Sequence, residues 1–321
     1  MNERYTIGID LGGTKLLAAL VDEQGNIVSH KQQLTDVSGG KEAVISQIAR
    51  SVKDFMSEPW VKDKVKNLGI SAAGPVDPLH GRLVQGTNFG WNDAPLKSIF
   101  EDMFQIPVCV ENDANAAAIA EHRIGAGKGS TDMVYVTIST GIGGGLILGG
   151  QLYRGATFAA GEIGHIVVET EGPLCNCGGM GCVESLASGP ATARRAVARI
   201  MRDERSSISE LVGGQLERVS AETVYQAAAN GDQLAREVVY QSGKYIGIAL
   251  ASVVNILNPQ VIVVGGGVSK AGDLLFKPLL ENLTCRVMKA QRNSVQVIPA
   301  KFGNFSAVLG AALLSTLDVN V

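Results

Sequence analysis

The stretch Tyr5-Thr6-Ile7-Gly8-Ile9-Asp10-Leu11-Gly12-Gly13-Thr14-Lys15 decides the fold of this chain. Its first half alternates in the manner of a half-buried strand, and the two glycines after it allow a tight turn. Two further apolar runs follow, separated by a short polar segment. The pattern predicts a β-meander with strands at residues 5–10, 16–21 and 27–32 and turns at 11–14 and 22–26.

The same plan recurs in the middle of the chain. A strand is expected at Met133–Ser139, a glycine turn at Thr140–Gly144, and further strands at Gly145–Leu148 and Leu152–Phe158. The chain is therefore expected to contain two copies of one unit.

Helical and strand patterns alternate after each copy, which is typical of an α/β fold. The boundary is expected near Ala117, with residues 1–117 and the closing segment 304–321 forming a smaller α/β domain. Residues 118–303 would then form a larger α/β domain that carries a cysteine-rich loop. Helices are expected at 40–57, 114–124, 189–205, 220–230, 232–257 and 306–317, and strands at 67–71, 106–110 and 260–264.

The composition limits the classes of partner. The net charge of −3 provides no basic surface for nucleic acid, so we expect no nucleic-acid partner. No apolar run approaches the ~20 residues needed to span a bilayer, so no membrane partner is expected either. The N-terminal residues resemble neither a secretory signal nor a transit peptide, which favours a cytoplasmic protein.

A short stretch gathers four potential metal ligands. Three thiolates and one imidazole match the tetrahedral coordination of structural zinc, and glycines between the cysteines allow a tight return of the chain. The alternatives are a disulfide pair or unrelated buried thiols. The remaining cysteines, Cys109 and Cys285, lie far away in sequence, so zinc is the preferred interpretation, with these ligands: His165, Cys175, Cys177 and Cys182.

Three glycine-rich segments are candidates for nucleotide binding. Backbone N–H groups without a Cβ can approach phosphate oxygens closely, and Asp10 beside the first segment is a suitable ligand for Mg²⁺. Each segment alone is more often a tight hairpin, or for the third a plain strand-to-helix turn, and none has the Walker form. The segments are Gly12-Gly13-Thr14-Lys15, Thr140-Gly141-Ile142-Gly143-Gly144 and Gly265-Gly266-Gly267, the third offering room for a ribose or a flat ring.

A carboxylate follows the expected strand at 106–110. Asp113 stands directly before an alanine-rich helix, so Asp113 or Asn112 is a helix cap in the simplest interpretation. Carboxyl ends of strands in α/β sheets also face ligand-binding crevices. There Asp113 could accept the proton of a substrate hydroxyl that attacks a γ-phosphate, while Asn112 binds a neighbouring hydroxyl.

Other polar residues suit a polyhydroxylated ligand. Carboxylate, amide and imidazole groups can bond vicinal hydroxyls, and a buried site built from them rejects analogues that leave them unpaired. Besides Asn112 and Asp113, the candidate contacts are Gly74, Asn88, Glu162, His165 and Glu184.

Five motifs, in this order, resemble the ROK family of repressors and sugar kinases, and most of all its bacterial glucokinases. The resemblance covers nearly the whole chain. The motifs are Asp10-Leu11-Gly12-Gly13-Thr14-Lys15, Glu111-Asn112-Asp113-Ala114-Asn115, Thr140–Gly145, Glu162-Ile163-Gly164-His165 and the segment from Cys175 to Glu184.

The resemblance implies an actin-like, ribonuclease-H-like duplicated ATPase fold with two domains flanking a cleft. It further implies ATP with Mg²⁺, transfer of the γ-phosphoryl group to a sugar 6-hydroxyl, and a homodimer. By the same resemblance Asp113 is the general base, and Asn112, Glu162, His165 and Glu184 contact the sugar. His165 would serve both zinc and sugar through its two ring nitrogens.

Two alternatives to a glucokinase stay open. Mannose, fructose, N-acetylglucosamine or N-acetylmannosamine could be the substrate, because pocket shape decides it. A non-catalytic sugar sensor is disfavoured by the presence of both Asp10 and Asp113. A repressor of this family would carry a helix-turn-helix domain ahead of the kinase fold, and we expect none because the first strand begins at once.

Overall fold

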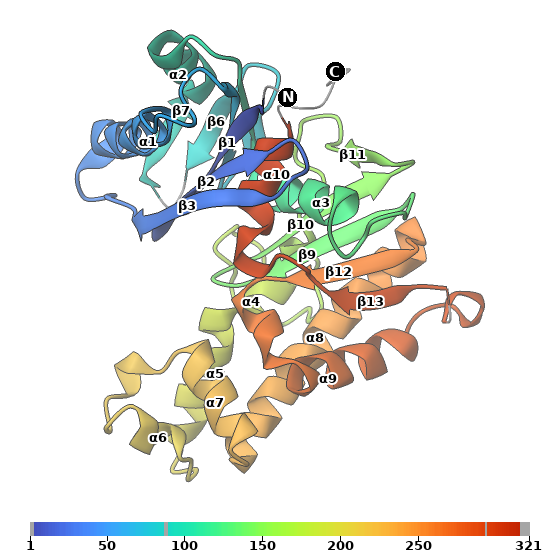
Figure 1. Cartoon of the computed structure of the whole chain (residues 1–321). Coiled ribbons are helices and arrows are strands. Elements are labelled where there is room, and N and C mark those ends of the chain that lie inside the picture. Colours follow the sequence, from blue (N-terminus) through green and yellow to red (C-terminus); the bar gives the residue numbers. More distant parts are fainter. Residues whose placement is uncertain (1–2, 87–88, 293, 315–321) are drawn as a thin grey trace. The chain divides into compact units, whose positions relative to one another are not determined.

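The computed structural model describes residues 3–86, 89–292 and 294–314 (Figure 1). Contacts divide the chain into two compact units. The first comprises Met1–Gly129, Gly145–Ala160 and Asn304–Val321, and the second comprises Ser130–Gly144 and Gly161–Gly303. The domain boundaries expected at 117/118 and 303/304 remain a proposal.

The N-terminal sheet contains the expected meander. Strand β1 pairs antiparallel with β2 and parallel with β4, β2 pairs antiparallel with β3, and β4 pairs parallel with β8. The order is β3-β2-β1-β4-β8. The bounds are β1 Tyr5–Leu11, β2 Lys15–Asp22, β3 Ile27–Leu34, β4 Val65–Ala72 and β8 Val108–Asn112.

Helices and a second, small sheet complete this part of the chain. Three short strands, β5, β6 and β7, form an antiparallel sheet that the sequence did not predict. Their bounds are β5 Val76–Asp77, β6 Arg82–Gly86 and β7 Trp91–Ala94. The helices are α1 Gly40–Met56, α2 Leu96–Phe104, α3 Asp113–Arg123 and α10 Ser306–Leu314, preceded by a 3₁₀ turn at Gly303–Phe305.

Helix α10 packs directly on the centre of this sheet. A Cβ on Gly69 of β4 would overlap the carbonyl oxygen of Ala311, and one on Gly8 of β1 would overlap that of Val308. Glycine is therefore required at both positions, because any side chain would push the helix off the strands.

Gly69→Ala is expected to destabilise the protein by several kcal/mol, on the order of 3 kcal/mol, as overpacking of a rigid backbone contact does. Thermal or denaturant unfolding would measure the loss. Gly267→Ala is the matched control, since a Cβ at Gly267 meets nothing within 4 Å. Equal stability of the two variants would contradict the close packing of α10.

A second five-stranded sheet has the order β11-β10-β9-β12-β13. Strand β12 pairs parallel with β9 and β13, and β10 pairs antiparallel with β11. The bounds are β9 Met133–Ile138, β10 Ile142–Leu148, β11 Gln151–Tyr153, β12 Val261–Gly265 and β13 Gln296–Pro299.

Most remaining helices belong to the second unit, where α8 and α9 lie side by side (Figure 1). The α-helices are α4 Val183–Ala187, α5 Gly189–Ile200, α6 Ile208–Leu211, α7 Ala221–Ala229, α8 Gln233–Leu257 and α9 Asp273–Thr284. The 3₁₀ turns are Ile163–His165, Leu216–Arg218, Gly267–Ala271 and Lys289–Gln291.

The two five-stranded sheets repeat one topology. In each, the first strand along the chain lies at the centre, the second and third follow on one side, and the fourth and fifth lie on the other. The predicted duplication and the α/β class are thus confirmed.

The extent of some elements differs from expectation. The strand expected over 152–158 ends at Tyr153, because Gly155 and Phe158 both have a positive φ that a strand does not allow. The expected helix over 189–205 ends at Ile200. In the described part of the chain, no helix is both long and apolar enough to cross a membrane.

Candidate functional site

Asp10 lies near the carboxyl end of β1, where the strand runs into the first glycine turn. Ser71 of β4 donates a hydrogen bond of 3.0 Å from Oγ to its Oδ1. The pKa of Asp10 is raised to about 7, mainly by burial and also by the nearby Asp113 carboxylate, while the Ser71 hydrogen bond partly opposes both. Two carboxyl groups held close together favour a cation between or beside them, which fits the expected Mg²⁺ ligand.

The variant Asp10→Asn tests whether the pKa of Asp10 is raised in the folded protein. The folded-state pKa lies above the unfolded value, so ionising Asp10 costs stability as pH rises from about 4 to 7, and the full cost remains above pH 7. We expect the variant to exceed the wild type in free energy of unfolding by about 1–3 kcal/mol at pH 8. The difference should vanish near pH 4. Denaturant unfolding at both pH values measures this difference in free energy of unfolding. An equal difference at both would contradict the raised pKa of Asp10.

Asn112 and Asp113 lie at the junction of β8 and α3. The Asn112 side chain is the cap, since its Oδ1 accepts from the backbone N–H groups of Ala114 and Asn115 at 2.9 and 3.1 Å. Its Nδ2 donates to the carbonyl oxygen of Gly74 at 3.2 Å. The capping interpretation therefore holds for Asn112, and Asp113 is the first residue of the helix, close enough to Asp10 to raise its pKa.

A buried carboxylate behind this junction was not predicted as a site residue. Glu111 is 2% exposed and accepts hydrogen bonds from the Asn112 backbone N–H at 3.0 Å and from Asn115 Nδ2 at 3.1 Å. Its other oxygen pairs with Arg154 Nε at 2.7 Å. This network fixes the backbone that presents Asn112. The position of Glu111 within the Glu-Asn-Asp motif was the available signal.

Gly74, one of the expected ligand contacts, lies beside Asn112 and accepts the hydrogen bond from its Nδ2. Its φ is +129°, and a Cβ there would overlap the carbonyl oxygen of Gln85, so only glycine fits. Asn88, the other expected contact in this region, lies outside the described residues.

The first glycine loop, Gly12–Lys15, closes a hairpin between β1 and β2. Gly12 N donates to the Lys15 carbonyl oxygen at 3.0 Å, and Thr35 binds the loop through Oγ1 to the Gly12 carbonyl oxygen at 2.7 Å. Thr14 and Lys15 are exposed. The hairpin interpretation of this loop is therefore correct, and it leaves the exposed groups available to a ligand.

The second glycine loop, residues 140–144, joins β9 to the start of β10. Thr140 is exposed, while Gly144 is buried against Ile163, where a Cβ would come within 2.5 Å of Cδ1. Packing thus explains Gly144 without a ligand.

The third glycine segment follows β12. Gly266 has φ +82°, and a Cβ would overlap the carbonyl oxygen of Ile138, whereas a Cβ on Gly267 would meet open space. The geometry supports the strand-to-turn interpretation for Gly266. The role of Gly267 toward a nucleotide stays a prediction.

The four expected zinc ligands come together. Each offers one ligand atom, and these atoms all lie within 4.8 Å of one another. Cys177 Sγ lies 3.7 Å from Cys182 Sγ, and Cys175 Sγ lies 3.7 Å from His165 Nδ1. The set is called the His/Cys cluster below: His165, Cys175, Cys177 and Cys182.

These distances test whether the cluster fits zinc. Tetrahedral zinc with Zn–S near 2.3 Å and Zn–N near 2.05 Å requires S···S of about 3.8 Å and S···N of about 3.6 Å. A disulfide requires sulfurs about 2.05 Å apart, and the cysteines are free thiols. The spacing matches a shared metal ion and not a covalent pair.

Glu162 and Glu184 flank the His/Cys cluster on different sides. Glu162 Oε2 lies 3.7 Å from His165 Nε2, so Nδ1 faces the thiols and Nε2 faces away from them. Glu184 follows Cys182 by two residues, and its Oε1 lies 3.9 Å from Cys175 Sγ. The expected use of both ring nitrogens is compatible with this orientation.

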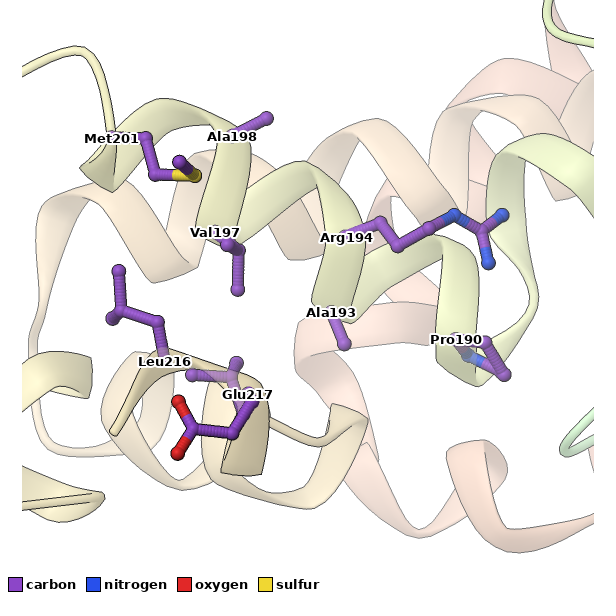
Figure 2. Close-up of a pocket in the computed structure, with 9 residues that line it drawn as sticks. Pro190, Ala193, Arg194, Val197, Ala198, Met201, Leu216 and Glu217 are labelled. Carbon is purple, nitrogen blue, oxygen red and sulfur yellow. The ribbon is translucent and has the colours of Figure 1, made fainter. Parts of the chain in front are cut away.

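A groove on the surface of the second unit has a different character. Figure 2 shows it between α5 and the segment around Leu216, lined mainly by apolar side chains. Arg194 and Glu217 are the charged residues among those that line it, and none of the expected site residues does. The groove is therefore not the candidate site.

The sequence matches the ROK family over residues 6–317. It is 35% identical to the glucokinase of Halalkalibacterium halodurans over 98% of this chain and 96% of that protein.

Solved structures of the family share the fold. A ROK family glucokinase from Streptomyces griseus, in complex with glucose and AMPPNP, has a TM-score of 0.86 at 36% identity and covers 97% of this chain and 98% of that one. A ROK family transcriptional regulator, a homologue of the Escherichia coli Mlc protein, has a TM-score of 0.87 at 27% identity and covers 97% and 78%. The motifs from Asp10 to Glu184, the duplicated sheets and these similarities agree: the chain belongs to the ROK family.

Proposed function

We propose that the protein is a glucokinase that transfers the γ-phosphoryl group of ATP to the 6-hydroxyl of glucose. The observation that carries this proposal is the similarity over nearly the full chain to a ROK glucokinase that binds glucose and AMPPNP, combined with the paired carboxyl groups of Asp10 and Asp113. A protein that only bound sugar would gain nothing from placing Asp113 where it raises the pKa of Asp10.

Asp113 is the proposed general base. The sugar 6-hydroxyl oxygen attacks the γ-phosphorus, the bond to the β–γ bridging oxygen breaks, and ADP leaves while the hydroxyl proton passes to Asp113. The Asn112 cap fixes the backbone of Asp113 in the first turn of α3, and the Oδ1 of Asp113 accepts a hydrogen bond from the Ala114 N–H at 2.9 Å. Asn112 and Gly74 are proposed to bind neighbouring sugar hydroxyls, and Asn88 is proposed on its sequence alone.

Asp10 would hold Mg²⁺, which neutralises phosphate charge when bound. The first glycine loop, Gly12, Gly13, Thr14 and Lys15, is proposed to approach the phosphates. In the second unit, the residues proposed to contact the nucleotide are Thr140, Gly141, Gly143, Gly144, Gly266 and Gly267.

Glu162, His165 and Glu184 are proposed as further sugar contacts, and the His/Cys cluster as the holder of a structural Zn²⁺. Metal sites orient the groups around them, so an ordered cluster fixes His165 and the adjacent glutamates. The protein is further proposed to be a homodimer, which light scattering would test.

A coupled assay for ADP release with Mg-ATP tests the function. Glucose, mannose, fructose, N-acetylglucosamine and N-acetylmannosamine are supplied in turn. Turnover confined to glucose supports the glucokinase, and preference for another sugar keeps the mechanism but changes the substrate. Sugar binding without any turnover would replace the kinase with a non-catalytic sugar sensor.

A further inference from the structure

Glu184 makes a direct bond to the second glycine loop. Its Oε2 accepts a hydrogen bond from the backbone N–H of Ile142 at 2.9 Å. A Cβ on Gly141 would lie 2.6 Å from the same oxygen, so the carboxylate rests against the bare backbone of the loop. Glu184 and the loop are far apart in sequence, and the contact arises from the fold.

The same loop also packs against the 3₁₀ turn that carries His165. Gly164, in the 3₁₀ turn that carries His165, approaches Ile142 so closely that a Cβ would overlap the Ile142 carbonyl oxygen. A Cβ on Gly144 would lie 2.6 Å from the Gly161 carbonyl oxygen. The loop is therefore held at Ile142 from two sides, by Glu184 through the N–H and by the His165 turn at the carbonyl.

Glu184 and the turn that carries His165 are both attached to the His/Cys cluster. Glu184 lies in the first turn of α4, two residues after Cys182, and its Oε1 is 3.9 Å from Cys175 Sγ. The backbone N–H of Val183 donates to the Ile166 carbonyl oxygen at 2.9 Å, which ties α4 to the residue after His165. Disorder of the cluster would release both contacts with Ile142 together.

We propose that Glu184 is a positioning residue for the second glycine loop, and that the His/Cys cluster sets the conformation of that loop. The cluster then supports nucleotide binding as well as the arrangement of the sugar contacts. Because Glu184 is also a proposed sugar contact, sugar binding and nucleotide binding are coupled through this one carboxylate. By linkage the coupling is reciprocal: sugar tightens nucleotide binding by the same factor as nucleotide tightens sugar binding. The nucleotide part of this inference rests on the proposed function, and the loop conformation does not.

Hydrogen exchange at the Ile142 amide tests the positioning role without any ligand. Losing a hydrogen bond to a carboxylate should speed exchange of this amide at least about tenfold in Glu184→Ala. Glu184→Gln retains a carbonyl acceptor of the same length and should keep most of the protection. Removing bound metal from the wild type with a chelator should speed the same amide. Unchanged exchange in Glu184→Ala overturns the positioning role, and unchanged exchange after chelation overturns the role of the cluster.

Calorimetric titration with Mg-AMPPNP, without sugar, tests the consequence for nucleotide. We expect Glu184→Ala to raise the Kd about tenfold, comparable to the loss of one charged hydrogen bond. Glu162→Gln is the matched control, because it alters the other glutamate beside the cluster, which lies at His165 Nε2. It should weaken glucose binding and leave the AMPPNP Kd unchanged.

The outcomes separate the two proposals. If the wild type binds no AMPPNP, the proposed kinase fails, and the Ile142 amide still decides whether Glu184 positions the loop. If the wild type binds AMPPNP and Glu184→Ala binds it equally well, the coupling through Glu184 is wrong while the kinase stands.

Discussion

Replacing Asp113 with asparagine is expected to lower kcat by about 10²–10⁴-fold, the usual contribution of a positioned general base. The amide keeps the size of the side chain but cannot take the hydroxyl proton. The structure favours an intact fold in this variant, because the cap of α3 is Asn112 and not Asp113. Steady-state kinetics with Mg-ATP and glucose measures the loss, and KM should change far less than kcat.

The stability of the same variant provides a second measurement. Removing the Asp113 charge relieves the repulsion that raises the pKa of Asp10, so Asp113→Asn should be no less stable than the wild type at pH 8. Asp102→Asn, an exposed carboxyl group on α2, serves as the control and should retain full activity. A nearly normal kcat in Asp113→Asn would remove Asp113 from the mechanism.

Replacing Cys177 with serine is expected to remove the zinc and most of the activity. Elemental analysis should find one Zn per wild-type chain and well below one in the variant, because a serine hydroxyl is a poor ligand for this ion. Cys177 is exposed, so the substitution leaves the core packing intact. The loss would therefore come from the ligand set, through disorder of residues 162–184.

Cys285→Ser is the matched control for the zinc prediction. Cys285 is also an exposed free thiol, and it is not one of the four ligands of the cluster. It should keep both metal and activity. Stoichiometric zinc that persists in Cys177→Ser would contradict the ligand set, and full activity in a zinc-free variant would contradict the supporting role of the metal.

Local patterns predicted the larger elements well. The meander at β1–β3 follows from short-range alternation, and the long helix α8 follows from helical periodicity. The structure adds the cap of α8, Asp232, which accepts from the Ala235 N–H at 2.8 Å. The small sheet β5–β7 was missed, because strands of two to five residues leave too short a pattern to recognise.

The site was predicted unevenly for the same reason. Cysteine and histidine spacing within one segment predicted a cluster that the structure brings together. The pair Glu111–Arg154 was not predicted, because its members meet only after β8 and the segment following β11 are placed in the fold. A sequence motif marked Glu111, but nothing local indicated its partner.

The sequence by itself determined the α/β class, the duplication, the family and the gathering of four potential metal ligands, since each depends on residue types close together along the chain. Only the tertiary structure decided that Asn112 and not Asp113 caps α3, that the pKa of Asp10 is raised, and that Glu184 bonds the Ile142 N–H. These properties depend on burial and on distances between groups far apart in sequence. Such distances exist only once the strands and helices have packed.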